Sequence, residues 1–320
     1  MNPIIEEIGK IGIVPVIALE KTEDAAPLAK ALIKGGLPCA EVTFRTDAAE
    51  EAIRIMTGQY PGMLVGAGTV LTTEQADRAI KAGAKFVVSP GLNPRVVSYC
   101  LEREIPILPG TANPSDVEAA IELGLEAVKF FPAKQAGGVE MIKAMSAPYP
   151  NMKFMPTGGI SADNLKEYLD FDKVIACGGS WMVKKELVAA GKFDEIERLT
   201  REAVETMLGF ELKHVGVNVP DEKEAENTAG TFGTIFGMGI KDSGGSFFAG
   251  SGIEVMKKPG LGKNGHIAIA ANSVDRAIWH LKAKGIAFDE ATEKRDTRGH
   301  VKVIYLKEEI GGFAIHFIQK

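Results

Sequence analysis

Three ionisable side chains stand where the sequence is otherwise apolar, which makes them the first candidates for chemistry. Lys129 lies inside the run AVKFFP, which has the character of a buried strand. Glu41 and Arg45 lie within and just after a second such run, CAEVTF. Strand alternation places Glu41, Thr43 and Arg45 on one face, and burying ionisable groups is costly unless they pair or work. We therefore expect Lys129, Glu41 and Arg45 to meet inside the fold.

Two interpretations of this set are open. In the first, the lysine, the glutamate and the arginine form a structural salt-bridge network. In the second, Lys129 is a Schiff-base nucleophile, because desolvation by the two phenylalanines after it and the cation of Arg45 lower the pKa of its amine. Glu41 then acts as acid and base, and Arg45 binds a substrate carboxylate. We favour the second, because residues 1–213 contain no histidine to hold a metal that would activate a carbonyl.

Two glycine pairs, in PTGGIS and CGGSW, indicate an anion site. Gly158 and Gly159 allow the backbone to approach a ligand closely, and a helix that begins near Ser161 directs free N–H groups outward. Ser180 adds a hydroxyl. The simpler alternative is that these glycines only make tight turns. We favour phosphate binding, because phosphate sites in (β/α)8 barrels form after strands seven and eight.

The elements that would position these residues repeat one unit, an apolar run followed by a helical stretch. Eight evenly spaced units predict a (β/α)8 TIM barrel over residues 1–210, with an open doubly wound sheet as the alternative. A dinucleotide-binding fold is rejected, because VGAGTV lacks the third glycine of that fingerprint. Helix starts are predicted at Thr72, Asn113 and Ser161. The expected strands are IVPVIA (13–18), CAEVTF (39–44), LVGAGT (64–69), FVVSPG (86–91), PILPG (106–110), AVKFFP (127–132), KFMPTGG (153–159) and VIACGGS (174–180).

Residues 211–320 differ in composition, since all five histidines of the chain lie there. Their pattern predicts an α+β domain of two β-α-β-β-β modules, which begin with the strands LKHVGVNV and GHIAIAAN. Of the histidines, His280 on the predicted helix and His300 at a strand start are expected at the surface.

Overall composition sets the class of protein. The 320 residues carry a net charge of −5, with 45% hydrophobic and 25% charged residues, which is ordinary for a globular chain of two domains. The mild acidity offers no attraction to nucleic acid or to an anionic membrane, and no apolar run approaches the length of a spanning helix. Three scattered cysteines predict neither a disulfide framework nor a zinc knuckle. Because the start also lacks a signal-peptide pattern, we expect a cytoplasmic protein.

Residues 11–208 closely resemble the 2-keto-3-deoxy-6-phosphogluconate (KDPG)/4-hydroxy-2-oxoglutarate aldolases. The shared stretches occur in order and at family spacing: IVPVIA, AEVTFRT, VGAGTV, SPGL, VKFFPA, PTGGIS and GGSWMV. The resemblance implies a class I aldolase without a cofactor, which cleaves KDPG to pyruvate and glyceraldehyde 3-phosphate. It also implies a homotrimer. The unphosphorylated 4-hydroxy-2-oxoglutarate, which yields pyruvate and glyoxylate, can use the same chemistry.

The same resemblance implies a role for each matching residue. Lys129 falls on the Schiff-base lysine and Glu41 on the proton-transfer glutamate. The substrate carboxylate would be held by Arg45 and Thr69. Further positions complete the implied pocket: Pro90 and Phe131 line the pyruvyl group, Thr157 faces the C4 hydroxyl, and Gly158, Gly159 and Ser180 hold the phosphate.

Residues 211–320 resemble, more loosely, the glyoxalase/vicinal-oxygen-chelate superfamily. The resemblance depends mainly on GHIAIAANSVDRAIWHLKAKGI and on the closing strand. It implies a divalent metal site on the first and last strands of each module, at His214, Glu254, His266 and His316. His316 takes a place where that superfamily usually has glutamate. Three imidazoles and one carboxylate suit zinc, nickel, iron or manganese.

Three hypotheses for the whole chain follow. The chain is an aldolase with a second, metal-dependent isomerase or lyase domain, or an aldolase with a non-catalytic domain that binds an effector or partner. In the third, the barrel binds a phosphate without catalysis, which the intact lysine, glutamate and arginine set disfavours.

Overall fold

The computed structural model describes residues 1–320, and the chain divides into two compact units, Met1–Met207 and Leu208–Lys320. The division lies at the end of a helix, just before the boundary expected after residue 210. No helix combines the length and the apolar character that crossing a membrane requires.

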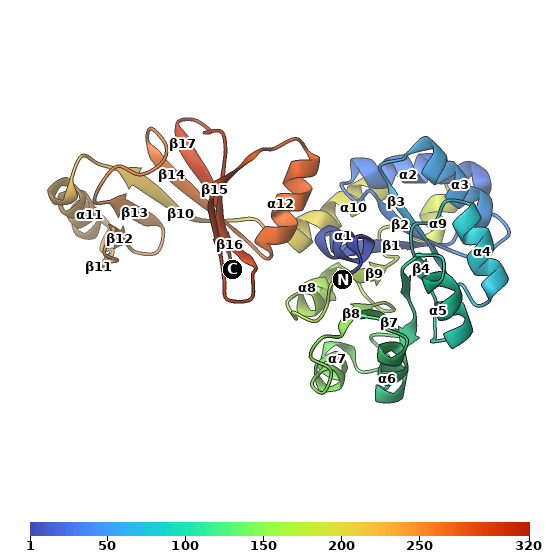
Figure 1. Cartoon of the computed structure of the whole chain (residues 1–320). Coiled ribbons are helices and arrows are strands. Elements are labelled where there is room, and N and C mark those ends of the chain that lie inside the picture. Colours follow the sequence, from blue (N-terminus) through green and yellow to red (C-terminus); the bar gives the residue numbers. More distant parts are fainter. The chain divides into compact units, whose positions relative to one another are not determined.

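Strands and helices alternate along most of the first unit (Figure 1). A strand occurs in each of the eight predicted apolar runs. The strands are β1 (Ile13–Ile17), β2 (Cys39–Thr43), β3 (Leu64–Gly68), β4 (Val87–Val88), β5 (Ile107–Leu108), β6 (Gly110–Thr111), β7 (Ala127–Phe130), β8 (Lys153–Pro156) and β9 (Cys177–Gly179).

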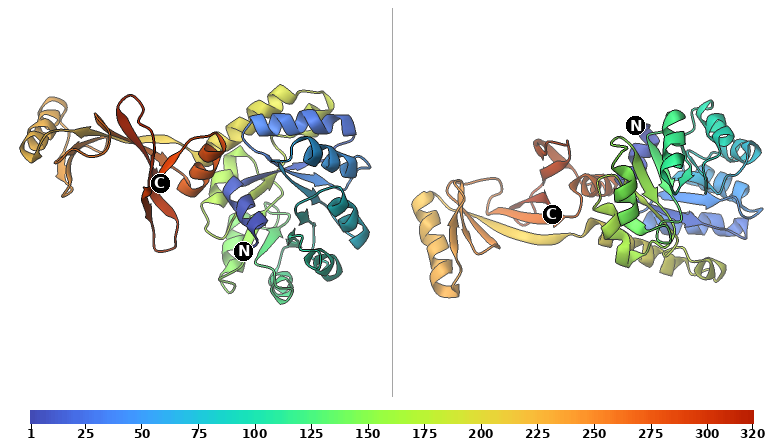
Figure 2. Two further views of the ribbon diagram at one scale, coloured as in Figure 1. Left: turned by 45° about the horizontal axis from the view of Figure 1, so that its top comes forward. Right: turned by 90° about the horizontal axis from the view of Figure 1, so that it is seen from below.

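The helices of this unit form a layer outside the strands (Figures 1 and 2). Helix α1, for example, turns Ile5, Ile8 and Ile11 inward at three-residue spacing. Burying each such side chain contributes about 1.5–3 kcal/mol. The helices are α1 (Pro3–Ile11), η1 (Thr22–Asp24), α2 (Ala25–Lys34), α3 (Ala49–Gln59), α4 (Thr73–Lys81), α5 (Pro94–Leu101), α6 (Pro114–Glu122), α7 (Gly138–Ser146), α8 (Ala162–Leu169), α9 (Lys185–Ala189) and α10 (Phe193–Leu208).

The three predicted helix starts are confirmed. Thr72 Oγ1 accepts a hydrogen bond from the Gln75 N–H (3.2 Å), and Asn113 caps α6 in the same way. Ser161 is the N-cap of α8, where its own N–H donates to Asn164 Oδ1 (2.9 Å). These caps satisfy backbone donors that the first helical turn leaves free.

The strands of the first unit pair in parallel and form an α/β barrel-like fold. Six of them follow the order β5-β4-β3-β2-β1-β9, and three follow the order β6-β7-β8. Only Pro109 separates β5 from β6, and parallel bridges join Phe154 to Val174 and Thr157 to Gly178 on the other side. The carboxyl ends of parallel strands therefore gather at one end of the unit, where catalytic residues of such folds collect.

The second unit contains the element order β-α-β-β-β twice. The first set is β10 (Glu211–Asn218), α11 (Glu222–Phe236), β11 (Ile240–Asp242), β12 (Ser246–Ala249) and β13 (Ile253–Met256). The second set is β14 (Gly265–Ala271), α12 (Val274–Ala283), β15 (Phe288–Arg295), β16 (Val301–Leu306) and β17 (Phe313–Gln319).

All eight strands of this unit form one sheet in the order β11-β12-β13-β10-β14-β17-β16-β15. The first strands of the two sets, β10 and β14, pair antiparallel at its centre, and each pairs in parallel with the last strand of its own set. Helix α11 packs on β12 and β13, and α12 packs on β16 and β17. The arrangement brings the first and last strands of both sets together in the middle of the sheet.

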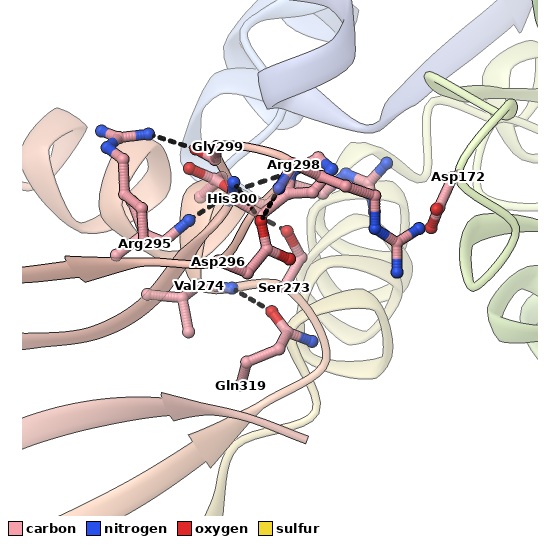
Figure 3. A network of polar contacts seen from close by, with 12 residues as sticks. Asp172, Ser273, Val274, Arg295, Asp296, Arg298, Gly299, His300 and Gln319 are labelled. Carbon is pink, nitrogen blue, oxygen red and sulfur yellow. Dashed lines mark hydrogen bonds and ion pairs between the residues drawn. The ribbon is translucent and has the colours of Figure 1, made fainter.

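The turn between β15 and β16 is closed by one carboxylate (Figure 3). Asp296 Oδ1 accepts hydrogen bonds from the N–H groups of Arg298 (2.8 Å) and His300 (3.0 Å). This turn sets the register of a hairpin whose second strand pairs with β17. Tyr305 of β16 is thereby placed opposite His316.

The prediction that His280 lies at the surface is wrong, because its side chain is only 2% exposed. Val274, Ala277 and His280 follow at three-residue intervals and form the buried face of α12. The ring of Trp279 contacts the imidazole edge to face at 4.8 Å. His300 is exposed, as predicted.

Candidate active site

Lys129 and Glu41 meet inside the barrel-like unit. They come from β7 and β2, 88 residues apart in the chain, and Lys129 Nζ lies 3.4 Å from Glu41 Oε1. The lysine side chain is 7% exposed and the glutamate side chain 1%. A buried ion pair of this kind is weak evidence for stability, since desolvation offsets much of the attraction.

The space for the Glu41 carboxylate depends on a glycine. Gly68 of β3 lies beside Glu41, and a Cβ at that position would fall 2.3 Å from Glu41 Oε1. The second oxygen of the carboxylate, Oε2, is buried and has no hydrogen-bond partner in the protein. Buried polar atoms are almost always paired, so this oxygen is free to take a proton or bind a water or ligand.

The prediction that Arg45 is buried beside Lys129 is wrong, because Arg45 is exposed and forms no ion pair. Strand β2 ends at Thr43, so the chain has left the sheet before Arg45. Its guanidinium is nevertheless held, since Arg45 Nε donates to Thr43 Oγ1 (3.2 Å), and Thr43 Oγ1 donates to the Ile17 carbonyl (2.8 Å). The three-residue salt-bridge network is therefore reduced to the pair of Lys129 and Glu41.

Three further predicted residues lie just beyond strand ends. Thr69 follows β3 and has a positive φ of 56°, a strained backbone for a residue other than glycine. Pro90 follows β4 and packs against Gly110, since a Cβ at Gly110 would lie 2.0 Å from the Pro90 carbonyl oxygen. The ring centroid of Phe131 lies 5.3 Å from Lys129 Nζ, so an aromatic face borders the amine.

The glycine loop after β8 has the backbone that its sequence predicts. Gly158 and Gly159 have φ values of 102° and 75°. Thr157 is buried, and its Oγ1 has no hydrogen-bond partner. The bridge from Thr157 to Gly178 aligns the ends of β8 and β9, where the exposed Ser180 follows. Free polar groups thus follow two adjacent strands.

A cavity of about 370 Å³ lies elsewhere in this unit. Its lining includes Met1, Ile5 of α1, and Ile107 and Ala127 at the starts of β5 and β7. None of the predicted site residues lines it. Because catalytic residues of such folds collect at the opposite strand ends, we do not assign the active site to this cavity.

The second unit holds a separate buried cluster on the central strands of its sheet. His214 Nε2 of β10, His266 Nε2 of β14 and Glu254 Oε2 of β13 lie 3.1 Å from one another. The His266 ring fits there because residue 216 is a glycine: a Cβ at Gly216 would lie 2.1 Å from the ring. His316 of β17 completes the set, with its ligand atom within 4.8 Å of those of the other two histidines.

The charges of this cluster suit a cation. Burial acts to raise the pKa of Glu254, but hydrogen bonds from His214, His266 and Ser246 outweigh it and hold the pKa well below its usual range. Burial and the two neighbouring imidazoles lower the pKa of His316 to about 4, and both of its ring nitrogens are buried without partners. A neutral imidazole with a free nitrogen is the form that ligates a metal.

The structure also identifies residues that the sequence analysis missed. Thr43 accepts the hydrogen bond of Arg45 Nε. Strand alternation, which places the two residues on one face, was the signal that could have found it. Ser246, by contrast, donates to Glu254 Oε1 (2.5 Å). It begins the strand β12, and no sequence pattern indicates that its hydroxyl meets the carboxylate of the next strand. Tyr305 contacts His316 edge to face at 4.6 Å, a pairing that only the strand register reveals.

Comparisons with known proteins agree with the geometry of the first unit. The model of the family "KDPG and KHG aldolase" matches residues 4–199. A 2-dehydro-3-deoxy-phosphogluconate aldolase of Haemophilus influenzae is 50% identical over 202 residues, which are 63% of this chain and 95% of that protein. A KHG/KDPG aldolase of Escherichia coli is 44% identical over 193 residues, 60% of this chain and 91% of that protein.

Among solved structures, a KDPG aldolase of Legionella pneumophila, with pyruvate captured as a covalent carbinolamine, is 38% identical at a TM-score of 0.61. The match covers 62% of this chain and 97% of that one. A KDPG aldolase of Zymomonas mobilis with 3-phosphoglycerate is 40% identical at a TM-score of 0.58, over 62% and 94% of the two chains.

An α/β barrel-like fold with a lysine and a glutamate buried together, matched over its length by aldolases, defines the class of this protein as an aldolase, a lyase. More particularly, the chain belongs to the KDPG and KHG aldolase family. Residues 200–320 lie outside the matched range.

Proposed function

We propose that the first unit cleaves 2-dehydro-3-deoxy-6-phosphogluconate to pyruvate and glyceraldehyde 3-phosphate through an imine at Lys129. The observation that carries the proposal is the buried contact of Lys129 Nζ with Glu41 Oε1, beside an unpartnered Glu41 Oε2. The covalent carbinolamine of pyruvate in the Legionella relative supports the same chemistry.

The steps follow from the properties of the two side chains. The neutral amine of Lys129 attacks the C2 carbonyl, and loss of water gives a protonated imine that accepts electrons. Glu41, through a bound water, takes the proton of the C4 hydroxyl as the C3–C4 bond breaks and glyceraldehyde 3-phosphate forms. The enamine left on the lysine is protonated at C3, and hydrolysis of the resulting imine releases pyruvate and restores the amine.

The residues beyond the strand ends would hold the substrate. In this proposal Arg45 and Thr69 bind the carboxylate, while Pro90 and Phe131 line the pyruvyl group. Thr157 faces the C4 hydroxyl, with an Oγ1 that lacks a protein partner. The phosphate would bind at Gly158, Gly159 and Ser180.

The unphosphorylated 4-hydroxy-2-oxoglutarate would be cleaved to pyruvate and glyoxylate by the same steps. The relative from Escherichia coli, named for both substrates, supports this second substrate.

Borohydride reduction in the presence of pyruvate tests the imine. We expect a stable adduct on Lys129, located by peptide mass spectrometry, and none in the Lys129→Ala protein. An adduct on any other lysine would overturn the assignment.

We also propose that the two parallel sheets of the first unit form one (β/α)8 barrel, with β5 and β6 as one strand interrupted at Pro109. The same proposal includes a homotrimer. Light scattering should then give three times the chain mass of 34.2 kDa, and a monomer would contradict it.

For the second unit we propose a divalent metal site of the glyoxalase/vicinal-oxygen-chelate kind. The donors would be His214, Glu254, His266 and His316, because three of their ligand atoms already converge at 3.1 Å and the fourth residue has unpartnered nitrogens. A transition metal bound there would supply Lewis-acid chemistry toward a second oxygen-bearing compound. The alternative is a module that binds an effector without catalysis.

Metal analysis of the purified chain tests this site. We expect one equivalent of a transition metal in the unchanged protein and its loss in His266→Ala. A metal-free protein that also binds none when zinc, manganese, nickel or iron is added would overturn it.

A further inference from the structure

The two oxygens of Glu254 have different surroundings. Oε2 faces the imidazoles, 3.1 Å from His214 Nε2 and 3.1 Å from His266 Nε2. Oε1 points the other way and accepts a hydrogen bond from Ser246 Oγ at 2.5 Å. The carboxylate is therefore oriented by a group that does not itself belong to the cluster of donors.

Ser246 is fixed by its own neighbours. It stands at the start of β12, which pairs with the strand that carries Glu254, and it is only 2% exposed. Its Oγ lies 2.7 Å from Ser243 Oγ, and the Ser243 N–H donates to the Ser246 carbonyl (3.0 Å). Ser243 Oγ also lies 3.0 Å from the Ser246 carbonyl oxygen and donates to it. Because Ser246 gives its one proton to the carboxylate, the single proton of the Ser243 hydroxyl lies between the Oγ and the carbonyl oxygen of Ser246.

We propose that Ser246 is a positioning residue that keeps Glu254 a one-oxygen metal ligand. This inference rests on the proposed metal site. With Oε1 engaged by the hydroxyl, the carboxylate presents Oε2 alone, and the site offers one oxygen beside three imidazole nitrogens. Such a set suits a four-coordinate transition metal and disfavours calcium and magnesium, which require many oxygen ligands.

Loss of the hydroxyl should act on the metal. A carboxylate without the hydrogen bond to Oε1 can rotate or bind through both oxygens, and loss of such an outer partner typically weakens metal binding about 10–100-fold. If Ser246 served only the hairpin, its replacement would change the stability of the fold and leave metal binding unaffected.

The test uses the full chain, stripped of metal and titrated with Zn²⁺ against a chelating dye, and separately loaded with Co²⁺. We expect Ser246→Ala to bind Zn²⁺ about 10–100-fold more weakly and to change the visible Co²⁺ spectrum, which reports coordination number. Ser246→Thr, which keeps the hydroxyl, should restore both. Ser251→Ala, an exposed serine in the next turn, is the matched control and should behave as the unchanged protein.

Equal Zn²⁺ affinity and an identical Co²⁺ spectrum in Ser246→Ala would overturn the inference. If that protein does not fold, Ser246→Cys, whose thiol is only a weak donor, is measured in its place: a changed Co²⁺ spectrum supports the inference, and an identical one overturns it. Failure of the proposed metal site gives a different result. In that case the unchanged chain binds no metal, or the His266→Ala protein binds as much metal as the unchanged chain.

Discussion

At the scale of single residues, the first unit depends on a lysine and a glutamate that share a water-poor space. Their contact at 3.4 Å is longer than a strong charge-assisted hydrogen bond, and Glu41 Oε2 is unpartnered. A pair that served only stability would be expected to satisfy both oxygens. The geometry therefore favours chemistry over a structural ion pair.

Glu41→Gln separates proton transfer from imine formation. Because glutamine cannot take the C4 proton, we expect kcat for KDPG cleavage to fall about 10²–10⁴-fold, while borohydride still traps pyruvate on Lys129. Coupled assay of pyruvate release and mass spectrometry of the adduct measure the two effects. Unchanged kcat would contradict the role of Glu41.

Thr43→Val tests whether Thr43 orients Arg45. The substitution keeps the shape and removes the acceptor of the Arg45 Nε bond, which is worth about 1.5–3 kcal/mol for a charged donor. We expect KM to rise about tenfold or more, with a smaller change in kcat and with recovery in Thr43→Ser.

Thr46→Val is the control for Thr43→Val. Thr46 also donates to a carbonyl of a neighbouring segment, that of Leu19, but the Arg45 Nε hydrogen bond goes to Thr43 and not to Thr46. An equal rise of KM in both valine proteins would show that only local packing had been lost.

At the scale of elements, the proposed substrate-binding residues lie on loops beyond the strand ends, and the glycine loop after β8 has the tightest backbone. Gly158 and Gly159 adopt positive φ, and the stem of Lys134 lies so close to Gly159 that a Cβ there would fall 2.5 Å from Lys134 Cβ. The loop therefore tolerates no side chain at Gly159 without moving.

Gly159→Ala should act mainly on phosphorylated substrate. We expect kcat/KM for KDPG to fall at least about tenfold, or about 1.4 kcal/mol, and that for 4-hydroxy-2-oxoglutarate to fall less. Gly191 has a similar φ of 64° but open space around it, so Gly191→Ala is the control for backbone strain alone. Equal losses for both substrates would count against a phosphate site in this loop.

Helix α5 places a free thiol in the core. Burial raises the pKa of Cys100 to about 11, so the unfolded chain loses this proton first as the pH rises. The free energy of unfolding should therefore fall, by up to about 1.4 kcal/mol per pH unit, between about pH 8.5 and 11.

Urea unfolding at several pH values measures this effect of the thiol. Cys100→Ala should lose less stability over the same range. Parallel pH profiles of the two proteins would refute the contribution of Cys100.

At the scale of the whole molecule, two compact units share one chain, and the aldolase family model matches residues 4–199, which lie within the first. The strands that carry Lys129 and Glu41 belong entirely to Met1–Met207. A protein that ends at Met207 should therefore retain the pyruvate adduct and the kcat of the full chain. Loss of activity in a protein that still folds, as judged by circular dichroism, would mean that catalysis needs the second unit.

Local patterns were enough to locate the elements of both units. All eight apolar runs contain strands, the caps at Thr72, Asn113 and Ser161 begin helices, and each half of residues 211–320 has the order β-α-β-β-β. Strand alternation also singled out Lys129 and Glu41. These inferences succeeded because they depend on neighbours a few residues apart in the chain.

Contacts between distant strands were decided only by the tertiary structure. Arg45 is exposed because β2 ends two residues earlier, and His280 is buried because its helix turns that face toward β16 and β17. The bond of Ser246 to Glu254 depends on the pairing of β12 with β13. Residue types and spacing therefore determined which groups could do chemistry, whereas strand order and register decided which of them meet, since those depend on packing across the whole unit.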